Sequence, residues 1–212
     1  VNKCNESIQN RRLEIIKNNK NSIVIIGGRF QLFVEDTTFN NKEGGIENGI
    51  EKKLNSIWIE NIKDKIENDK QKIFNKTMNN TIEKINNLGQ KTILLYPIPE
   101  VGWDLPRFYN NQIKKGYKLN NNYNHISTSF EVFEKRNEKT IDILDSIVHP
   151  NLYKIYPHKI FCDDLKDNKK RCKAMNNKSL FYMDSHHPVD GGIKIINSLI
   201  SEEIDKIDLK SN

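Results

Sequence analysis

The stretch Ser22–Gly28, SIVIIGG, is a continuous apolar run that ends in two glycines. Its β-branched residues and short length predict a buried strand of a parallel sheet. A second run, Lys91–Tyr96 (KTILLY), is predicted to be another such strand, and Pro97 ends it because proline has no N–H for the ladder. We expect two further strands at Leu152–Tyr156 (LYKIY) and Ser179–Met183 (SLFYM).

Segments with helical spacing of apolar residues separate these strands. We expect helices at about residues 5–19 and 46–88, from Ser127 or Ser129 to about Val148, and at about 190–207. Alternating strands and helices predict a three-layer α/β/α domain with a parallel, flavodoxin-like sheet. In the last helix one face is predicted to carry Ile193, Ile196, Leu199, Ile200 and Ile204.

The carboxyl ends of parallel strands are where sites form in such sheets. The segments to consider are therefore 27–30, 97–105 and 184–192. We expect the stretch from residue 97 to about 124 to be a long irregular loop, which in a compact domain is functional or disordered.

Composition limits the function classes. At 212 residues, with 36% hydrophobic and 29% charged residues, the chain fits one domain spanning 1–212. The net charge of +6 comes from lysines that alternate with acidic residues, so we expect no nucleic-acid partner. No apolar stretch reaches the length of a membrane span, and the sequence has no signal peptide.

A carboxylate and an imidazole lie three residues apart in YMDSHHPVDGG, which begins at Tyr182. If Asp184 accepts the Nδ1–H of His187, it fixes the tautomer in which Nε2 can take a proton from a nucleophile. The alternative is that His187 is an ordinary surface histidine. The other histidines lack ligand-like spacing, so neither a metal site nor a cofactor is expected.

These residues resemble a known family. An Asp-x-x-His-Pro block before the last helix is similar to the final block of the SGNH (GDSL-like) hydrolases. PIPEVGWDLP at residues 97–106, the loop between Cys162 and Cys172, and SLFYMDSHH together resemble the SGNH domains fused to the C-terminus of type 3 membrane acyltransferases. The resemblance covers nearly the whole chain, and PIPEVGWD is its most specific part.

The resemblance implies roles for further residues. The family's Gly-x-Asn-Asp block matches Gly27, Gly28 and Arg29, so Arg29 stands where an oxyanion-binding Asn is expected. There Arg29 could donate to an oxyanion or hold a sugar or carboxylate. Its alternative role is an ion pair with Glu35 or Asp36.

Two more residues, Trp103 and Glu100, leave alternatives open. Trp103 is either a platform for a sugar ring or a lid over the core. Glu100 could form a hydrogen bond across the site, although an acidic loop residue is usually solvated. Trp58 is expected in the core.

The chain departs from the family's pattern in one important respect. No Gly-Asp-Ser occurs in the sequence, so we expect the nucleophile and the first strand to be missing from an incomplete domain that is inactive by itself. The cysteines fit this picture. The polar setting of Cys162 and Cys172 favours a disulfide over two incidental thiols, and Cys4 would have its partner upstream.

Three functions follow from the resemblance. The first is the extracytoplasmic, periplasmic domain of a membrane O-acyltransferase, whose membrane domain in the same chain supplies the acyl donor and whose acceptor is a cell-surface glycan such as lipopolysaccharide. The second is a free SGNH carbohydrate esterase, in which water replaces the sugar. The third is a non-catalytic glycan-binding domain.

Overall fold

The computed structural model describes residues 6–49, 67–116, 126–162 and 169–209. Three strands form a parallel sheet in the order β1 (Ile23–Gly27), β2 (Lys91–Leu95) and β4 (Leu152–Ile155). The register pairs Ile25 with Ile93, and Ile93 with Tyr153. The three predicted runs are therefore strands of one sheet, with β2 between the other two.

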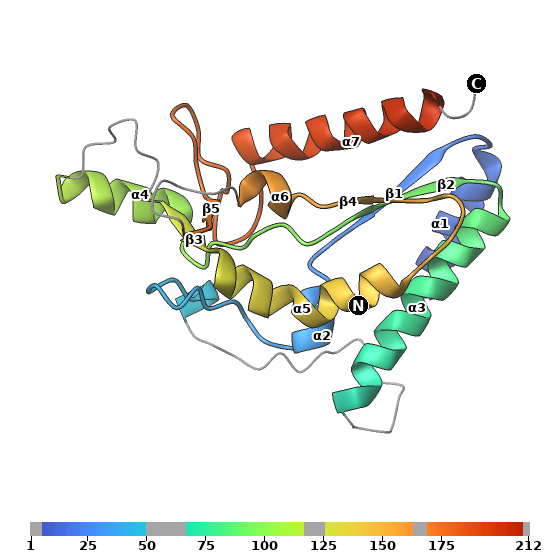
Figure 1. The fold of residues 1–212 in the computed structure, drawn as a ribbon, viewed down its shortest axis with the longest axis horizontal. Helices are drawn as coiled ribbons and strands as arrows, with labels where there is room; N and C mark the ends of the chain where they lie inside the picture. The colour runs from blue at the N-terminus through green and yellow to red at the C-terminus, as the bar shows by residue number, and fades with distance from the viewer. Residues whose placement is uncertain (1–5, 50–66, 117–125, 163–168, 210–212) are drawn as a thin grey trace.

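Helices cover both faces of this sheet (Figure 1). The helix α7 (Gly191–Leu209) lies on one face, where Ile207 packs against Ile93 and Ile155. On the opposite face, α2 (Gln31–Glu35), α3 (Glu67–Asn87) and α5 (Phe130–Ser146) lie together. Successive residues of β2 point to opposite faces, so Ile93 contacts the α7 side and Leu94 the α3–α5 side. The expected three-layer α/β/α fold is confirmed.

The strand β1 is less buried than its sequence predicts. Ile25 is 46% exposed: it points to the face covered by α7, which lies mainly over β4, and on this face Ile23 but not Ile25 packs against the buried cluster that contains Ile207. Among the described strands, β1 also pairs with β2 alone. A uniformly apolar sequence predicted the strand correctly, but it did not predict how completely the layers would cover it.

The predicted helices are partly confirmed. The first is α1 (Glu6–Asn18), and α3 ends at Leu88–Gly89, where Gly89 has a φ of +77°. Residues 47–49 form a short 3-10 helix, η1 (Glu47–Gly49), and residues 50–66, with Trp58, lie outside the described part of the chain. The prediction for Ile193 was wrong, since it is 42% exposed while Ile196 and Ile207 are buried.

Two predictions about local structure were wrong. The stretch after Pro97 is not irregular throughout, because it contains α4 (Leu105–Lys114), which Asp104 caps by accepting the N–H of Arg107. Residues 179–183 do not form a strand; they make isolated bridges, Met175 to Leu180 and Tyr182 to Pro188. Phe181 and Tyr182 of this segment are buried in a loop beneath α7, which explains its strand-like composition, whereas Met183 is exposed.

A small second sheet lies beyond the carboxyl end of the main one. It pairs β3 (Ser127–Ser129) with β5 (Arg171–Lys173) in antiparallel orientation, near α4 and α6 (His158–Phe161) (Figure 1). Ser129, the second of the two proposed caps, accepts the N–H of Val132 at the start of α5. No helix in the described part of the chain has the length and apolar character needed to cross a membrane.

Candidate active site

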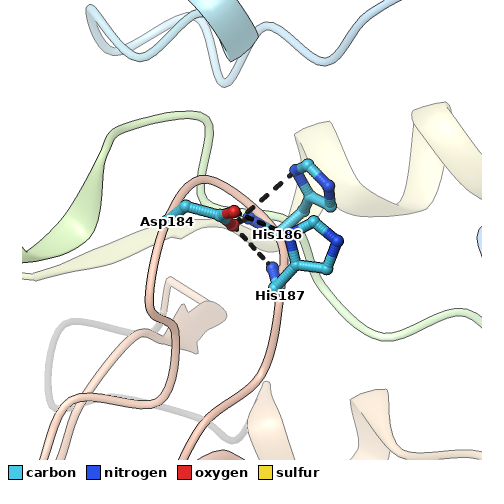
Figure 2. Close-up of side chains that lie close together, drawn as sticks. All are labelled: Asp184, His186 and His187. Carbon is cyan, nitrogen blue, oxygen red and sulfur yellow. Dashed lines mark hydrogen bonds and ion pairs between the residues drawn. The ribbon is translucent and has the colours of Figure 1, made fainter.

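The side chains of Asp184 and His187 form a short hydrogen bond on the loop before α7 (Figure 2). His187 Nδ1 lies 2.6 Å from Asp184 Oδ2, and Asp184 Oδ1 accepts the backbone N–H groups of His186 and His187 at 2.9 and 2.8 Å. The carboxylate therefore organises the loop and orients the ring together. The His187 side chain is 62% exposed, so the rest of the imidazole is accessible to a reacting group.

The pKa of Asp184 reflects these contacts. Partial burial raises it, but the two backbone N–H groups and the His187 side chain outweigh burial and lower the pKa to about 2. The carboxylate thus stays ionised in neutral solution. An ionised carboxylate on Nδ1 favours the tautomer in which Nε2 is free to accept a proton, as the sequence analysis expects.

The start of α7 and Phe181 hold the Asp–His loop in place. Met183 donates its N–H to the carbonyl of His187, and Val189 donates to Phe181. Gly192 lies so close to this turn that a Cβ would come within 2.4 Å of the Phe181 carbonyl. The entry into the last helix is therefore a close approach of two backbones, which glycine permits because it has no Cβ.

His186 is more buried than His187, and the two imidazole rings lie against each other with centroids 4.0 Å apart. Its Nδ1 lies 2.8 Å from Ser185 Oγ and 3.5 Å from Glu47 Oε1. Burial and the nearby charge of Arg29 lower its pKa below the ordinary value of 6.5. Ser185 is itself buried, and its carbonyl accepts the N–H groups of Val101 and Gly102 at 2.9 and 3.1 Å. The segment 97–105 and the Asp–His loop are thus hydrogen-bonded to each other.

Gly27, Gly28 and Arg29 lie at the carboxyl end of β1, as expected, but the partners of Arg29 differ from those proposed. Its guanidinium binds Glu47 through two hydrogen bonds of 2.9 and 2.7 Å and also binds Glu100. The alternative pairing with Glu35 or Asp36 was wrong, because those carboxylates face Lys139 and Lys70.

Glu100 is not a solvated loop residue. Only 4% of it is exposed, and it lies between Arg29 and Arg136, with Arg136 Nε 3.4 Å from Glu100 Oε2. Arg136 also donates to the hydroxyl and the carbonyl of Thr37. Two arginines and two glutamates therefore form a buried ion network beside the Asp–His loop.

Trp103 is half-buried and packs rather than standing free. Its ring stacks on Phe108 with centroids 4.3 Å apart, and its Nε1 lies beside Gly45, where a Cβ would come within 2.9 Å. Asn41 links the same loop to the segment 97–105 by donating to the Val101 carbonyl at 2.7 Å. These contacts favour the lid interpretation, and sugar stacking by Trp103 stays a prediction.

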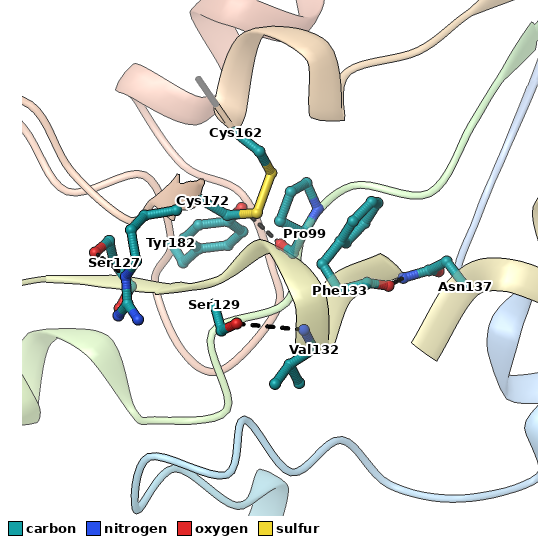
Figure 3. Close-up of a disulfide and its surroundings, with 10 residues drawn as sticks. Pro99, Ser127, Ser129, Val132, Phe133, Asn137, Cys162, Cys172 and Tyr182 are labelled. Carbon is teal, nitrogen blue, oxygen red and sulfur yellow. Dashed lines mark hydrogen bonds between the residues drawn. A yellow bond between two sulfur atoms is a disulfide. The ribbon is translucent and has the colours of Figure 1, made fainter. Parts of the chain in front are cut away.

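The expected disulfide between Cys162 and Cys172 is present (Figure 3). It joins the end of α6 to β5, next to Tyr182, whose hydroxyl donates to the Pro99 carbonyl at 2.6 Å. The bridge therefore fixes the small sheet against the segments that carry the site. Cys4 lies outside the described residues.

One cluster of possible metal ligands occurs in the described part of the chain. Asp184, His186 and His187 bring ligand atoms within 4.8 Å of one another. To bind an ion through both Nδ1 atoms, His187 would have to give up its hydrogen bond to Asp184. In the structure, that Nδ1 is used in the hydrogen bond to Asp184.

A separate hollow of about 510 Å³ lies between α5 and the chain that follows β4. Acidic side chains of α5 and the aromatic rings of Phe130, Phe133 and Tyr156 line it. None of the site residues predicted from the sequence contributes to its lining.

The fold and the site define a class: a parallel α/β domain that carries a hydrogen-bonded carboxylate and imidazole on the loop before its last helix. The family is more specific. The family model for the SGNH domain that is fused to AT3 domains matches residues 2–202, so the chain belongs to this family.

One solved structure is similar to the chain. It is the periplasmic domain of the lipopolysaccharide acetyltransferase of Salmonella ser. Paratyphi A, with a TM-score of 0.57 and 16% sequence identity. The match covers 93% of this chain and 62% of that domain, and at this identity it supports the fold. No curated protein matches the chain.

Three residues at the site were not found by sequence reasoning, namely Glu47, His186 and Arg136. Sequence position gives little signal for them, since Arg29 meets Glu47 and Glu100 across separations of 18 and 71 residues. The one available signal is charge in an apolar or Gly-rich setting, as in GGIENG around Glu47.

Proposed function

We propose that this chain is the extracytoplasmic domain of a membrane O-acyltransferase that transfers an acyl group, acetyl being the group expected, to a hydroxyl of a cell-surface glycan. The observation that carries the proposal is the 2.6 Å hydrogen bond between Asp184 and an exposed His187, in a family fused to AT3 membrane domains. The periplasmic setting of the similar Salmonella domain supports the same side of the membrane.

The reaction would proceed in two balanced steps. In the first, His187 Nε2 takes the proton of a serine hydroxyl while the serine oxygen attacks the acyl carbonyl; the bond to the donor breaks, and His187 returns the proton to the leaving group. In the second, His187 takes the proton of a sugar hydroxyl, which attacks the acyl-serine. The serine oxygen leaves and recovers the proton. Asp184 stabilises the imidazolium in both steps.

The 212-residue sequence does not contain the nucleophile block of the family. It contains no Gly-Asp-Ser, so the proposal requires a serine from elsewhere in the full-length protein. The acyl donor would reach that serine from the membrane domain, and no resident cofactor is needed for either step. A serine supplied close to His187 would complete the triad at the exposed edge of the ring.

The test is acyl transfer by the full-length gene product and its His187→Ala variant, measured as acetyl ester on the cell-surface glycan by mass spectrometry. We expect the substitution to lower turnover by on the order of 10³-fold or more. Met183→Ala is the matched control, since Met183 lies on the same loop and is 61% exposed. Unchanged glycan acetylation in His187→Ala would contradict the proposal.

The same experiment separates transfer from hydrolysis. The exposure of His187 would also allow water to reach an acyl-serine, which is the esterase reaction. An esterase would hydrolyse a simple acetyl ester at the same rate with or without glycan. A transferase would release acetate slowly until a glycan acceptor is added.

A further inference from the structure

We propose that Arg29 is a positioning residue, which orients the Asp184–His187 loop through Glu47 and Glu100, and that it does not bind the oxyanion. The inference rests on the proposed acyl transfer for its catalytic meaning. Its structural content, that the loop depends on Arg29, stands on the contacts of the chain itself.

Four of the five N–H groups of Arg29 are already used in hydrogen bonds to carboxylates. Nη1 and Nη2 donate to the two oxygens of Glu47, and Nε and Nη2 donate to Glu100. A guanidinium has five N–H groups, so these four hydrogen bonds leave one. An oxyanion donor must be preorganised toward the reacting atom, whereas this guanidinium is preorganised toward two carboxylates.

The charge of Arg29 is also compensated. Glu47 and Glu100 are buried, with 5% and 4% of each residue exposed, and Arg136 supplies the second positive charge. Two guanidinium groups and two carboxylates leave the network neutral. The hydrogen bond from Arg29 and the N–H of Phe39 outweigh the burial of Glu47 and hold its pKa below the ordinary value, which keeps it ionised.

Each of the two carboxylates leads to the Asp–His loop by its own path. Glu47 Oε1 lies 3.5 Å from Nδ1 of His186, the residue between Ser185 and His187. Glu100 precedes Val101 and Gly102, whose N–H groups donate to the carbonyl of Ser185. Arg29 binds both glutamates. It is therefore connected to the loop through the side chain of His186 and through the backbone carbonyl of Ser185.

Without Arg29, the hydrogen bond between Asp184 and His187 could still form, but the two side chains would no longer be held in one position. A catalytic group displaced by about 1 Å can lose on the order of 10²-fold in rate. We therefore expect Arg29→Gln to lower kcat with little change in KM. Lysine cannot bridge two carboxylates in the planar fork of arginine, so Arg29→Lys should rescue little.

A double-mutant cycle on kcat/KM of the full-length protein separates positioning from oxyanion binding. If Arg29 acts through Glu47, then Arg29→Gln combined with Glu47→Gln should cost about as much as the more damaging single change. If Arg29 binds the oxyanion, the two losses should multiply. The multiplied result would overturn the proposal.

A second measurement does not depend on acyl transfer. In the 212-residue chain, the proton between His187 Nδ1 and Asp184 should give a downfield NMR signal, and Arg29→Gln should broaden or remove it. The control is Lys70→Gln, which removes a half-buried ion pair with Asp36 and should leave the signal unchanged. Far-UV circular dichroism checks that each variant is folded.

The two measurements distinguish the possible failures. If the full-length protein transfers no acyl group, the proposed function fails and the NMR signal alone decides the positioning role. A signal that is unchanged in folded Arg29→Gln would sink the positioning role, whatever the activity.

Discussion

At the scale of single residues, the hydrogen bond between Asp184 and His187 decides which imidazole nitrogen can react. The carboxylate also accepts two backbone N–H groups, so one side chain sets both the loop and the tautomer. This dual role allows the two effects to be separated by the choice of substitution.

Asp184→Asn should preserve the conformation of the loop but impair His187 as a base. The amide oxygen can still accept the N–H groups of His186 and His187, while the amide group no longer supports a charged imidazolium. We expect kcat for acyl transfer by the full-length protein to fall by on the order of 10³–10⁴-fold. A loss smaller than tenfold would show that Asp184 does not orient the base.

The lowered pKa of Asp184 also predicts a pH dependence of stability. The folded pKa of about 2 lies below the ordinary value of 3.8, so the unfolded chain binds the proton first as pH falls. The contribution is therefore present above about pH 4 and lost towards pH 2. Because Asp184 is 39% exposed, solvent screening limits it to about 1 kcal/mol.

The measurement is the free energy of unfolding in urea at several pH values for the wild type and Asp184→Asn. The difference between the two should shrink as pH falls from 4 to 2. A difference that stays constant over this window would contradict the assigned pKa.

Sequence patterns predicted that Asp184 and His187 form a pair, but they did not predict the ion network beside that pair. Asp184 and His187 share one turn, so spacing alone brings them together. Arg29, Glu47 and Glu100 meet because two loops and a strand end converge, and a charged residue in a loop gives no sign of its future partner. For Glu100 the sequence accordingly left two alternatives open, a hydrogen bond across the site or exposure to solvent.

At the scale of elements, strands were predicted where a run is apolar on both faces. The run at 91–96 became the central strand, whereas the run at 179–183 became a buried loop. Both segments contain buried apolar residues, and the spacing of apolar residues cannot distinguish a strand from a buried loop. The helix α4 was missed although Asp104 and Pro106 are typical helix-start residues, because the surrounding prolines and glycine favoured a loop.

The cap of α4 gives a prediction at this scale. Asp104→Ala removes the side-chain acceptor for the Arg107 N–H and should lower the free energy of unfolding by about 1 kcal/mol. Asp104→Asn keeps an acceptor and should lose much less. Urea unfolding of both variants checks this, and equal losses would mean that the charge, not the cap, stabilises the helix.

The start of α7 gives a second prediction at the scale of elements. Gly192→Ala would place a Cβ within 2.4 Å of the Phe181 carbonyl and should cost about 1–3 kcal/mol, because one backbone has to shift. Gly28→Ala is the matched control, since its Cβ would meet Phe30 at an ordinary 3.6 Å. Thermal unfolding should show a clear drop in Tm for Gly192→Ala alone.

At the scale of the whole molecule, the order of strands and helices was enough to predict three layers, because few arrangements bury both faces of a parallel sheet. The sequence did not predict which apolar residues the layers would bury, as Ile25 and Ile193 illustrate. Both residues belong to apolar patterns, yet Ile25 is exposed on β1 and Ile193 is exposed on α7 itself. The small β3–β5 sheet was not predicted either, and its strands hold three residues each.

The disulfide links that small sheet to the rest of the domain and gives the last prediction. It closes a loop of sequence separation 10, for which the loss of chain entropy in the unfolded state corresponds to about 2–3 kcal/mol. Reduction should therefore lower the urea midpoint of the wild type, measured in a Cys4→Ser background so that this third thiol cannot exchange. In that background, the double change Cys162→Ser and Cys172→Ser should start from the lower midpoint and not respond to reductant.

Because Cys172 is next to Ala174 and Phe181 in one buried cluster, the reduced protein should also show a weaker signal from the His187 Nδ1 proton. If the midpoint falls but that signal is unchanged, the bridge stabilises the small sheet without ordering the Asp–His loop.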